Sequence, residues 1–234
     1  FSTQNDYSDS GGDLSSSRAF GAGLCNETRG LFAGNSIPYE NIIEYVTIST
    51  LGNSLDFGDI SYGKSGYAYG FSSTTRGIIA GGLRVSAPDT DSYNEVGFVT
   101  ISSTGNTTDF GDLLFDKYEG GAGTSATRGV VMAGYGPNYT SRIEFCTMAT
   151  TGNFINFGDL TNLNGSGKYS ASSKTRAVVG GGYVHPGSGD LGYSNTIEFV
   201  TIATTGNGAD FGDFINFGRR ANSFNNSCNG HGGL

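Results

Sequence analysis

An internal repeat of about 50 residues, present in four copies, constrains this chain more than any other feature. Each copy contains a Thr-Arg pair, and the pairs recur at steps of 47, 52 and 48 residues. A Gly-Asn pair follows, and four residues after its Gly comes the tetrad Asp-Phe-Gly-Asp, or Asn-Phe-Gly-Asp in the third copy. The Arg residues are Arg29, Arg76, Arg128 and Arg176, and the tetrad Phe residues are Phe57, Phe110, Phe157 and Phe211. Because the markers keep one order through four copies, the chain is built from repeated structural units.

Each copy predicts four short β-strands. A Gly-rich first strand, such as 66–71, precedes the Thr-Arg pair, and a second strand follows it, as at 77–80. The third strand is rich in aromatic and β-branched residues, which favour strands; it lies at 44–48, 97–101, 144–148 and 198–202. The Gly-Asn pair predicts a tight hairpin into the fourth strand, which carries the tetrad Phe. Four antiparallel strands in about 50 residues match one blade of a β-propeller.

The sequence therefore predicts an all-β fold, a β-propeller that forms one repeat domain over 1–234. The predicted full units are 14–59, 60–112, 113–159 and 160–213, flanked by partial units at 1–13 and 214–234. Residues 1–13 resemble a lone fourth strand, since Gly12 and Asp13 precede Arg29 by the interval that separates Gly111 and Asp112 from Arg128. The last segment resembles a first strand, with His231 in the Arg position. Split end units either close a ring by pairing with one another or pair with a neighbouring subunit, and the sequence does not choose between these two alternatives.

The repeat resembles known families. Two Gly after the second strand, with aromatic residues in the third and fourth strands, are similar to the kelch motif, although Phe stands where kelch repeats usually have Trp. The fuller pattern of Thr-Arg-Gly, Gly-Gly, Ile-Glu-Tyr-Val-Thr-Ile, Thr-Gly-Asn and Asp-Phe-Gly-Asp resembles repeats in structural and tail-fibre-like proteins of marine cyanobacterial phages. The ending His231-Gly232-Gly233-Leu234 is also similar to theirs. This resemblance implies a kelch-like propeller located in the virion, in either the head or the tail.

The repeated residues have structural interpretations. We expect the four tetrad Phe side chains to be buried between neighbouring sheets, with the tetrad Gly in a turn and the tetrad Asp capping backbone amides. The Arg residues are expected to pair with these Asp carboxylates in a ring of charge-assisted hydrogen bonds. The alternatives are a calcium site at the paired Asp residues and an anion-binding channel lined by Arg. A kinase-type magnesium motif is excluded because its companion Lys and His-Arg-Asp motifs are missing.

Binding is expected in the loops between the second and third strands, which differ most between copies. Each loop holds one of the four Pro residues and a Tyr. The candidate binding residues are Tyr39, Tyr93, Asn138, Tyr139, His185 and Tyr193. Tyr and Asn suit contacts with sugars or proteins. The alternative is that Pro and Tyr only stiffen these loops.

Composition excludes several classes of function. A net charge of −8 disfavours a nucleic-acid partner, and no apolar run is long enough to span a membrane. Three widely spaced cysteines, Cys25, Cys146 and Cys228, argue against a disulfide framework or a zinc site. We expect no metal, no cofactor and no catalytic residues: the two His lie far apart in sequence, and Glu44, Glu144 and Glu198 repeat one position. The chain begins with Phe1 and shows no signal peptide, which favours a processed chain or a fragment.

Two classes of function remain. The first is a non-enzymatic virion protein, such as an appendage, fibre or capsid decoration, present in several copies or as a homo-oligomer. Its partners would be other virion proteins and a host-surface glycan. The alternative is a secreted carbohydrate-active enzyme on a propeller scaffold.

Overall fold

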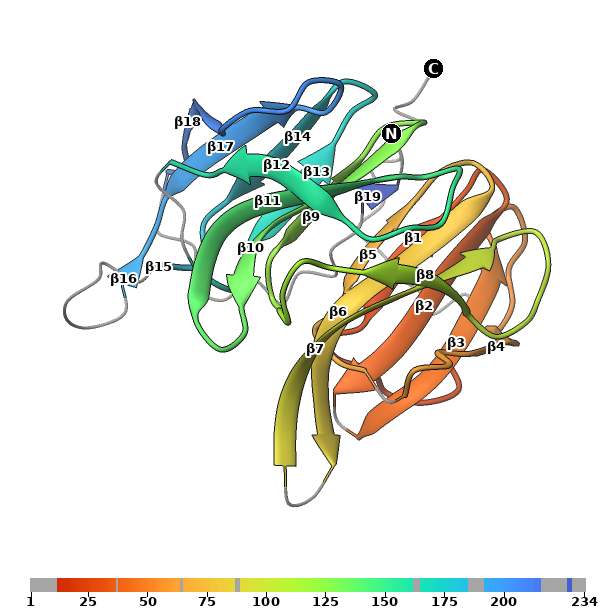
Figure 1. Cartoon of the computed structure of the whole chain (residues 1–234). Helices are drawn as coiled ribbons and strands as arrows, with labels where there is room; N and C mark the ends of the chain where they lie inside the picture. Colours follow the sequence, from red (N-terminus) through yellow and green to blue (C-terminus); the bar gives the residue numbers. More distant parts are fainter. Residues whose placement is uncertain are drawn as a thin grey trace.

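The computed structural model describes residues 12–36, 38–63, 65–86, 89–161, 165–184, 192–215 and 227–228 (Figure 1). Within them, regular structure is β-strand throughout, which confirms the all-β expectation. Sheet A holds β1 (Ala22–Cys25), β2 (Arg29–Ser36), β3 (Tyr39–Thr47) and β4 (Leu55–Asp59). Sheet B holds β5 (Tyr69–Ser72), β6 (Arg76–Ser86), β7 (Asp89–Thr100) and β8 (Thr108–Asp112). Sheet C holds β9 (Gly121–Thr124), β10 (Arg128–Tyr135), β11 (Tyr139–Thr147) and β12 (Ile155–Asp159). Sheet D holds β13 (Tyr169–Ser172), β14 (Arg176–Gly180), β17 (Thr196–Thr201) and β18 (Ala209–Asp213).

Two short elements complete the topology. β15 (Tyr183–Val184) and β16 (Gly192–Tyr193) form a two-stranded extension of the hairpin in sheet D. β19 (Ser227–Cys228) pairs in parallel with β5. The four sheets themselves are antiparallel meanders, each with its strands in sequence order.

The sheets pack face to face around a common centre. Each of the three buried clusters draws its side chains from two successive sheets, A with B, B with C, and C with D. The first strands β1, β5, β9 and β13 contact one another in that order, and β19 contacts all four. Stacking buries both faces of the inner sheets, which a single sheet cannot do. The arrangement is propeller-like, and no hydrogen-bonded ladder joins sheet D to sheet A among the described strands.

The tetrad Phe side chains are buried in three of the four sheets. Phe57, Phe110 and Phe157 are at most 3% exposed, as predicted. The prediction for Phe211 is wrong, because its side chain is 56% exposed. Each buried Phe faces the next sheet, whereas sheet D has no following sheet among the described residues. Position in the series, rather than local sequence, therefore decides burial.

The Gly-Asn pairs lie in connections of seven residues between the third and fourth strands, as at 148–154, so the predicted tight hairpins are wrong. In sheets B, C and D these Gly-Asn turns hydrogen-bond to the tetrad of the preceding sheet. The N–H of Gly152 donates to the Phe110 carbonyl at 2.7 Å, and the Asn153 side chain accepts from the Asp112 N–H at 3.0 Å. The same two contacts recur at Gly105 and Asn106 against Phe57 and Asp59, and at Gly206 and Asn207 against Phe157 and Asp159. The expected cap is thus reversed at these positions: the Asn side chain caps the Asp amide.

The tetrad Gly permits this close approach and does not form the expected turn. Gly111 lies within β8 at a bulge with φ of 135°, and a Cβ there would lie 2.6 Å from the Gly152 carbonyl. Gly58 and Gly158 also have positive φ and an equally close neighbour. Only Gly fits such a position without displacing the adjoining turn.

The predicted Arg–Asp ring is wrong. Each repeated Arg instead lies over the aromatic ring of its own third strand, 4.5 to 4.6 Å from the ring centroid, on Tyr45, Phe98, Phe145 or Phe199. Arg29, Arg76 and Arg128 also donate to a backbone carbonyl of the next sheet, at Ile101, Met148 and Ile202. The Arg side chains therefore join neighbouring sheets through carbonyl groups rather than through carboxylates.

The cysteine expectation also needs correction. Cys25 is disulfide-bonded, so a disulfide is present despite the odd number of cysteines. Cys146 is free and buried, and burial raises the pKa of its thiol to about 12. A buried, protonated thiol of this kind serves packing rather than chemistry.

Candidate functional site: an aromatic row on the hairpin face

The loops between second and third strands and the linkers that enter each first strand lie at the same end of the sheets. This arrangement results from the antiparallel order of the four strands, and Figure 1 shows these hairpins toward the lower edge of the view. We call this side the hairpin face. The Thr-Arg and Gly-Asn turns lie at the opposite end.

Five aromatic rings form a continuous row across the hairpin face, which we call the aromatic row. Its members are Phe20, Tyr67, Tyr118, Tyr135 and Tyr139, all partly exposed. Successive ring centroids are 4.4, 6.0, 5.4 and 4.5 Å apart. Three of the residues come from linkers that enter sheets A, B and C, and two come from the β10–β11 hairpin. The row therefore spans parts of three repeat units.

The backbone beneath the row is strained. Phe20, Tyr67 and Glu119 precede β1, β5 and β9, and all three have positive φ of 58–59°. This conformation costs a non-Gly residue about 1–3 kcal/mol, and such strain concentrates at functional sites. The Tyr67 N–H donates to the Phe20 carbonyl at 2.6 Å, and the Glu119 N–H donates to the Tyr67 carbonyl at 3.2 Å. These hydrogen bonds link the three entries and help to hold the strained geometry.

The Tyr hydroxyls in this region stay protonated. Burial, followed by the charge of Glu119, raises the pKa of Tyr118. Burial and the neighbouring Tyr67 and Glu119 raise the pKa of Tyr39. Both hydroxyls are therefore neutral donors and acceptors at physiological pH.

A pocket of about 510 Å³ adjoins the end of the row at Tyr139. The linker after β8 forms one wall with Leu114, Phe115 and Asp116. The β10–β11 hairpin forms the other wall with Pro137, Asn138, Tyr139 and Thr140, and Asn94 and Arg142 complete the lining. Phe115 is 51% exposed, with the Arg142 guanidinium 4.9 Å from its ring centroid. The pocket thus combines an exposed ring with amide, carboxylate and guanidinium groups.

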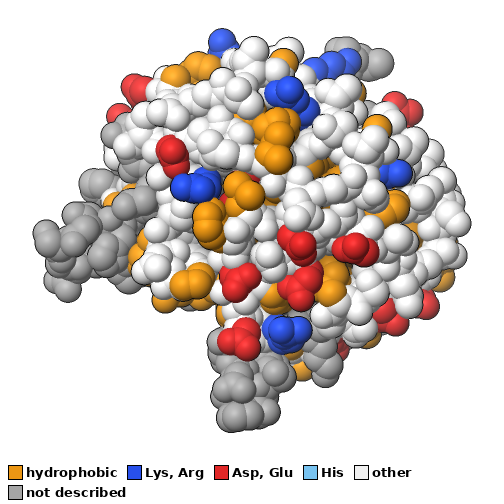
Figure 2. Space-filling view, in the orientation of Figure 1, with side chains coloured by type: hydrophobic (Ala, Val, Ile, Leu, Met, Phe, Trp, Pro, Cys, Tyr) orange, Lys and Arg blue, Asp and Glu red, His pale blue; other side chains and the backbone are white. Residues whose placement is uncertain are grey.

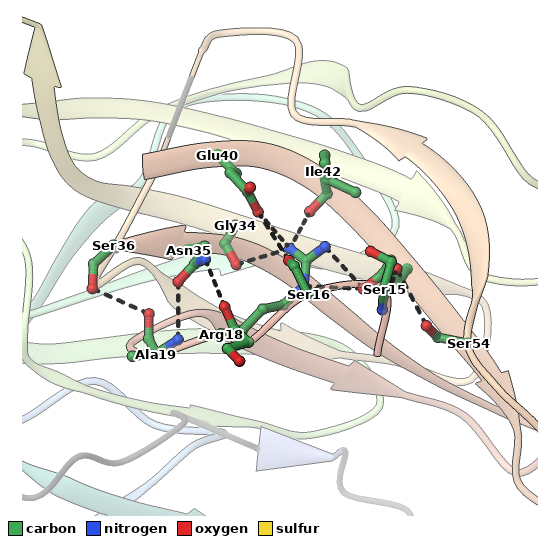
Figure 3. Close-up of polar contacts among 12 residues, drawn as sticks. Ser15, Ser16, Arg18, Ala19, Gly34, Asn35, Ser36, Glu40, Ile42 and Ser54 are labelled. Carbon is green, nitrogen blue, oxygen red and sulfur yellow. Dashed lines mark hydrogen bonds and ion pairs between the residues drawn. The ribbon is translucent and has the colours of Figure 1, made fainter. Parts of the chain in front are cut away.

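Buried charged pairs anchor the linkers that carry the row. Figure 3 shows Arg18 surrounded by acceptors, among them Glu40 and the carbonyls of Gly34 and Ile42. Arg18 also pairs with Glu44 at 2.8 Å. Burial alone would raise the Glu44 pKa, but hydrogen bonds from Ser15 and the Arg18 charge outweigh it, so the pKa is lowered. This pair fixes the linker two residues before Phe20.

Sheet C has an equivalent buried charged pair, in which Lys replaces Arg. The Lys117 ammonium donates to Glu144 at 2.9 Å, with both side chains buried, and the Leu114 N–H donates to the same carboxylate. Burial lowers the Lys117 pKa, while Glu144 opposes the shift. The repeated Glu position is therefore an anchor for linkers. In the second copy Gly97 leaves room for Tyr62, and the Ser61 N–H donates to Thr107 instead.

The six predicted binding residues differ in where the structure places them. Asn138 and Tyr139 line the pocket, and Tyr39 lies beside the linker at Gly66, close to Tyr67. Tyr193 is 39% exposed but lies away from the row, with its ring 4.9 Å from that of Tyr183. His185 lies outside the described residues. Among the four repeated Glu or Gly positions, none contributes to the pocket lining.

Tyr93 is the exception to the expected exposure, because only 5% of it is exposed. The β6–β7 hairpin is longer than the others, so Tyr93 lies within the ladder opposite Gly82 rather than at its end. Its ring packs edge-on against Tyr62. Tyr93 is therefore not available to a surface ligand in this structure.

Sequence reasoning missed most of the aromatic row. Phe20 and Tyr118 lie in linkers outside the repeated motifs. Tyr67 falls in the segment 66–71 that was predicted as a first strand, but β5 begins only at Tyr69. A signal was present, since these aromatic residues recur at steps of 47 and 51 residues, close to the steps of the repeated Arg. Phe115 has a weaker signal, because it follows Asp112 by three residues as Tyr62 follows Asp59, and the other two copies have Asn at this position.

The described part of the chain shows neither a metal cluster nor a membrane-spanning helix. No group of three or more His, Cys, Asp or Glu side chains there is placed to hold a metal ion. No helix there is long and apolar enough to cross a membrane.

Comparison with known proteins supports the fold. No protein-family profile matches the chain, and no curated protein matches it in sequence. Among solved structures, YjhT superposes with a TM-score of 0.72 at 8% identity, over 86% of this chain and 67% of YjhT. At this identity the similarity concerns the fold alone, and it supports a propeller-like arrangement of four-stranded antiparallel sheets.

Proposed function

We propose that this chain is a non-enzymatic recognition module of a virus particle, which binds a host-surface glycan along the aromatic row and in the adjoining pocket. The observation that carries the proposal is the row of five partly exposed rings, held on a strained but anchored backbone. The assignment to a virion rests on the resemblance of the repeat sequence to phage structural proteins. A kelch-like ancestry of the repeat belongs to the same proposal.

The chemistry of the site suits a sugar chain. Exposed aromatic faces pack against the apolar C–H faces of pyranose rings while polar side chains bind the hydroxyls. Asn138 supplies an amide, Asp116 a carboxylate, and Tyr118 a hydroxyl that stays protonated. Figure 2 shows acidic side chains gathered near the middle of the face drawn, which fits the net charge of −8. A neutral glycan is therefore favoured over an anionic polymer.

The test compares matched variants on a panel of immobilised glycans. Phe115→Ser and Tyr139→Ser, made singly, should each weaken glycan binding by about tenfold, the effect of losing roughly 1.4 kcal/mol of contact. Leu51→Ser is the control, because Leu51 is 81% exposed at the opposite end of the sheets. It should bind as the parent does.

Three outcomes contradict the proposal. Loss of glycan binding in the Leu51 variant alone would show that the binding site lies at the opposite end of the sheets. Binding to virion proteins but to no glycan would assign the row to protein docking. Cleavage of the bound glycan during incubation would favour the carbohydrate-active enzyme instead.

A further inference from the structure

The two outermost sheets expose faces that the inner sheets bury. On sheet D, the exposed face carries Phe211, with Val178, Ile197 and Phe199 partly exposed around it. Tyr169 and Phe214 join several of these residues around a hollow of about 290 Å³. The equivalent faces of sheets A, B and C are each covered by the following sheet.

Sheet A exposes the complementary face. Ile48 is 56% exposed, whereas Ile101, Met148 and Ile202, at the same position of the later copies, are at most 1% exposed. Phe32 and Val46 on the same face are partly exposed. In the other copies this is the face that receives the preceding sheet.

Sheets D and A also carry the donor and the acceptor of the hydrogen bond that joins neighbouring sheets elsewhere in the chain. Arg29, Arg76 and Arg128 donate to the carbonyls of Ile101, Met148 and Ile202 in the next sheet. Arg176 lies over Phe199 in the same way but is exposed, and no carbonyl of the described residues accepts from its side chain. The residue of sheet A that is equivalent to Ile101, Met148 and Ile202 is Ile48. A second copy of sheet A would supply the Ile48 carbonyl.

We propose that copies of this chain associate head to tail, with the exposed face of sheet D of one copy packed on the exposed face of sheet A of a second copy. Three internal junctions already show the geometry and chemistry of this contact. The interface is heterologous, so copies add head to tail, and they form a closed ring where the rotation between copies closes and an open chain where it does not.

The turn at Gly52 and Asn53 determines how the junction forms. Asp13 of the same chain occupies it, with its N–H donating to the Asn53 side chain at 3.1 Å and its carbonyl accepting from the Ser54 N–H at 2.9 Å. The dipeptide Gly12-Asp13 has the same sequence as Gly212-Asp213 of the last tetrad. Docking therefore exchanges Asp13 for Asp213 of the neighbouring copy, and these hydrogen bonds are replaced rather than lost.

Sedimentation velocity over a range of concentrations tests the proposal. The parent should form species larger than the monomer, and their share of the protein should rise with concentration. Phe211→Asp and Ile48→Lys should each remain monomeric alone, and an equimolar mixture of the two should form a one-to-one dimer. The mixture retains one intact sheet D face and one intact sheet A face, which is enough for a single junction.

Ile155→Asp is the matched control, because Ile155 is also 56% exposed but lies on neither face. It should associate like the parent, and circular dichroism should show that all three variants fold. A parent that stays monomeric at every concentration overturns the proposal, as does a mixture that stays monomeric. Association of Ile48→Lys alone would overturn it in favour of contacts between two D faces.

Discussion

Truncation of the tetrad Phe tests whether the stacking of sheets stabilises the fold. Phe110 and Phe211 occupy the same position of the repeat and have the same edge-on aromatic neighbour in their own sheet, at 6.1 Å for Phe98 and 6.0 Å for Phe199. They differ in whether a neighbouring sheet covers them. Phe110 is 1% exposed and packs against Phe154 of sheet C, whereas Phe211 is 56% exposed. The pair thus isolates the contribution of the next sheet.

Phe110→Ala should lower the free energy of unfolding by about 3–5 kcal/mol, as for other buried aromatic residues. In a chain of this size, each kcal/mol of lost stability lowers the melting temperature by about 2–4 °C. The melting temperature of Phe110→Ala should therefore fall by roughly 6–20 °C. Phe211→Ala should change the free energy of unfolding by no more than about 0.5 kcal/mol, the usual range for exposed sites.

Thermal unfolding followed by circular dichroism and tyrosine fluorescence measures both effects. Dilute protein is required, so that association does not cover Phe211. Equal shifts in the two variants would refute the reasoning, since burial between sheets would then not govern the contribution of this residue.

Further predictions concern polar contacts and pH. Asn153→Ala removes the acceptor for the Asp112 N–H and should cost about 0.5–1.5 kcal/mol in urea unfolding; no change would show that the turn contact is not stabilising. Lys117→Met leaves the Glu144 carboxylate buried without its partner and should cost about 3–5 kcal/mol, part of which Glu144→Gln in the same chain should restore. Burial lowers the Lys168 pKa to about 7. The unfolded chain therefore binds more protons than the folded chain between about pH 7 and the ordinary Lys pKa, and stability should rise with pH from 7 to 9. Lys168→Met should lack this rise in the unfolding midpoint. If the midpoint of the variant rises with pH as the parent's does, Lys168 is not the group responsible.

The strands were predictable because each copy supplies the same local signals. Apolar alternation around Val99 or Val200 and the Gly-Asn turns determine where strands start and end, and four copies reinforce each signal. The exposure of Phe211 was not predictable from its tetrad, which matches the others in sequence. Whether a sheet covers it is a property of the assembled array rather than of the local segment.

The candidate site was only partly predictable. Tyr139 could be found because it lies in a loop that differs between copies. The partners of Arg29 could not, since a carbonyl acceptor 72 positions away leaves no mark in the sequence. The aromatic row depends on linkers of three units meeting in space, and Tyr93 shows how hairpin length alone moves a similar residue into the core.

A crystal structure of the chain with an oligosaccharide selected on the glycan panel tests the central claim most directly. We predict sugar rings stacked on the aromatic row between Tyr67 and Tyr139, with one end of the oligosaccharide in the pocket beside Phe115. An oligosaccharide bound instead at the Gly-Asn turns, on the opposite end of the sheets, would contradict the account.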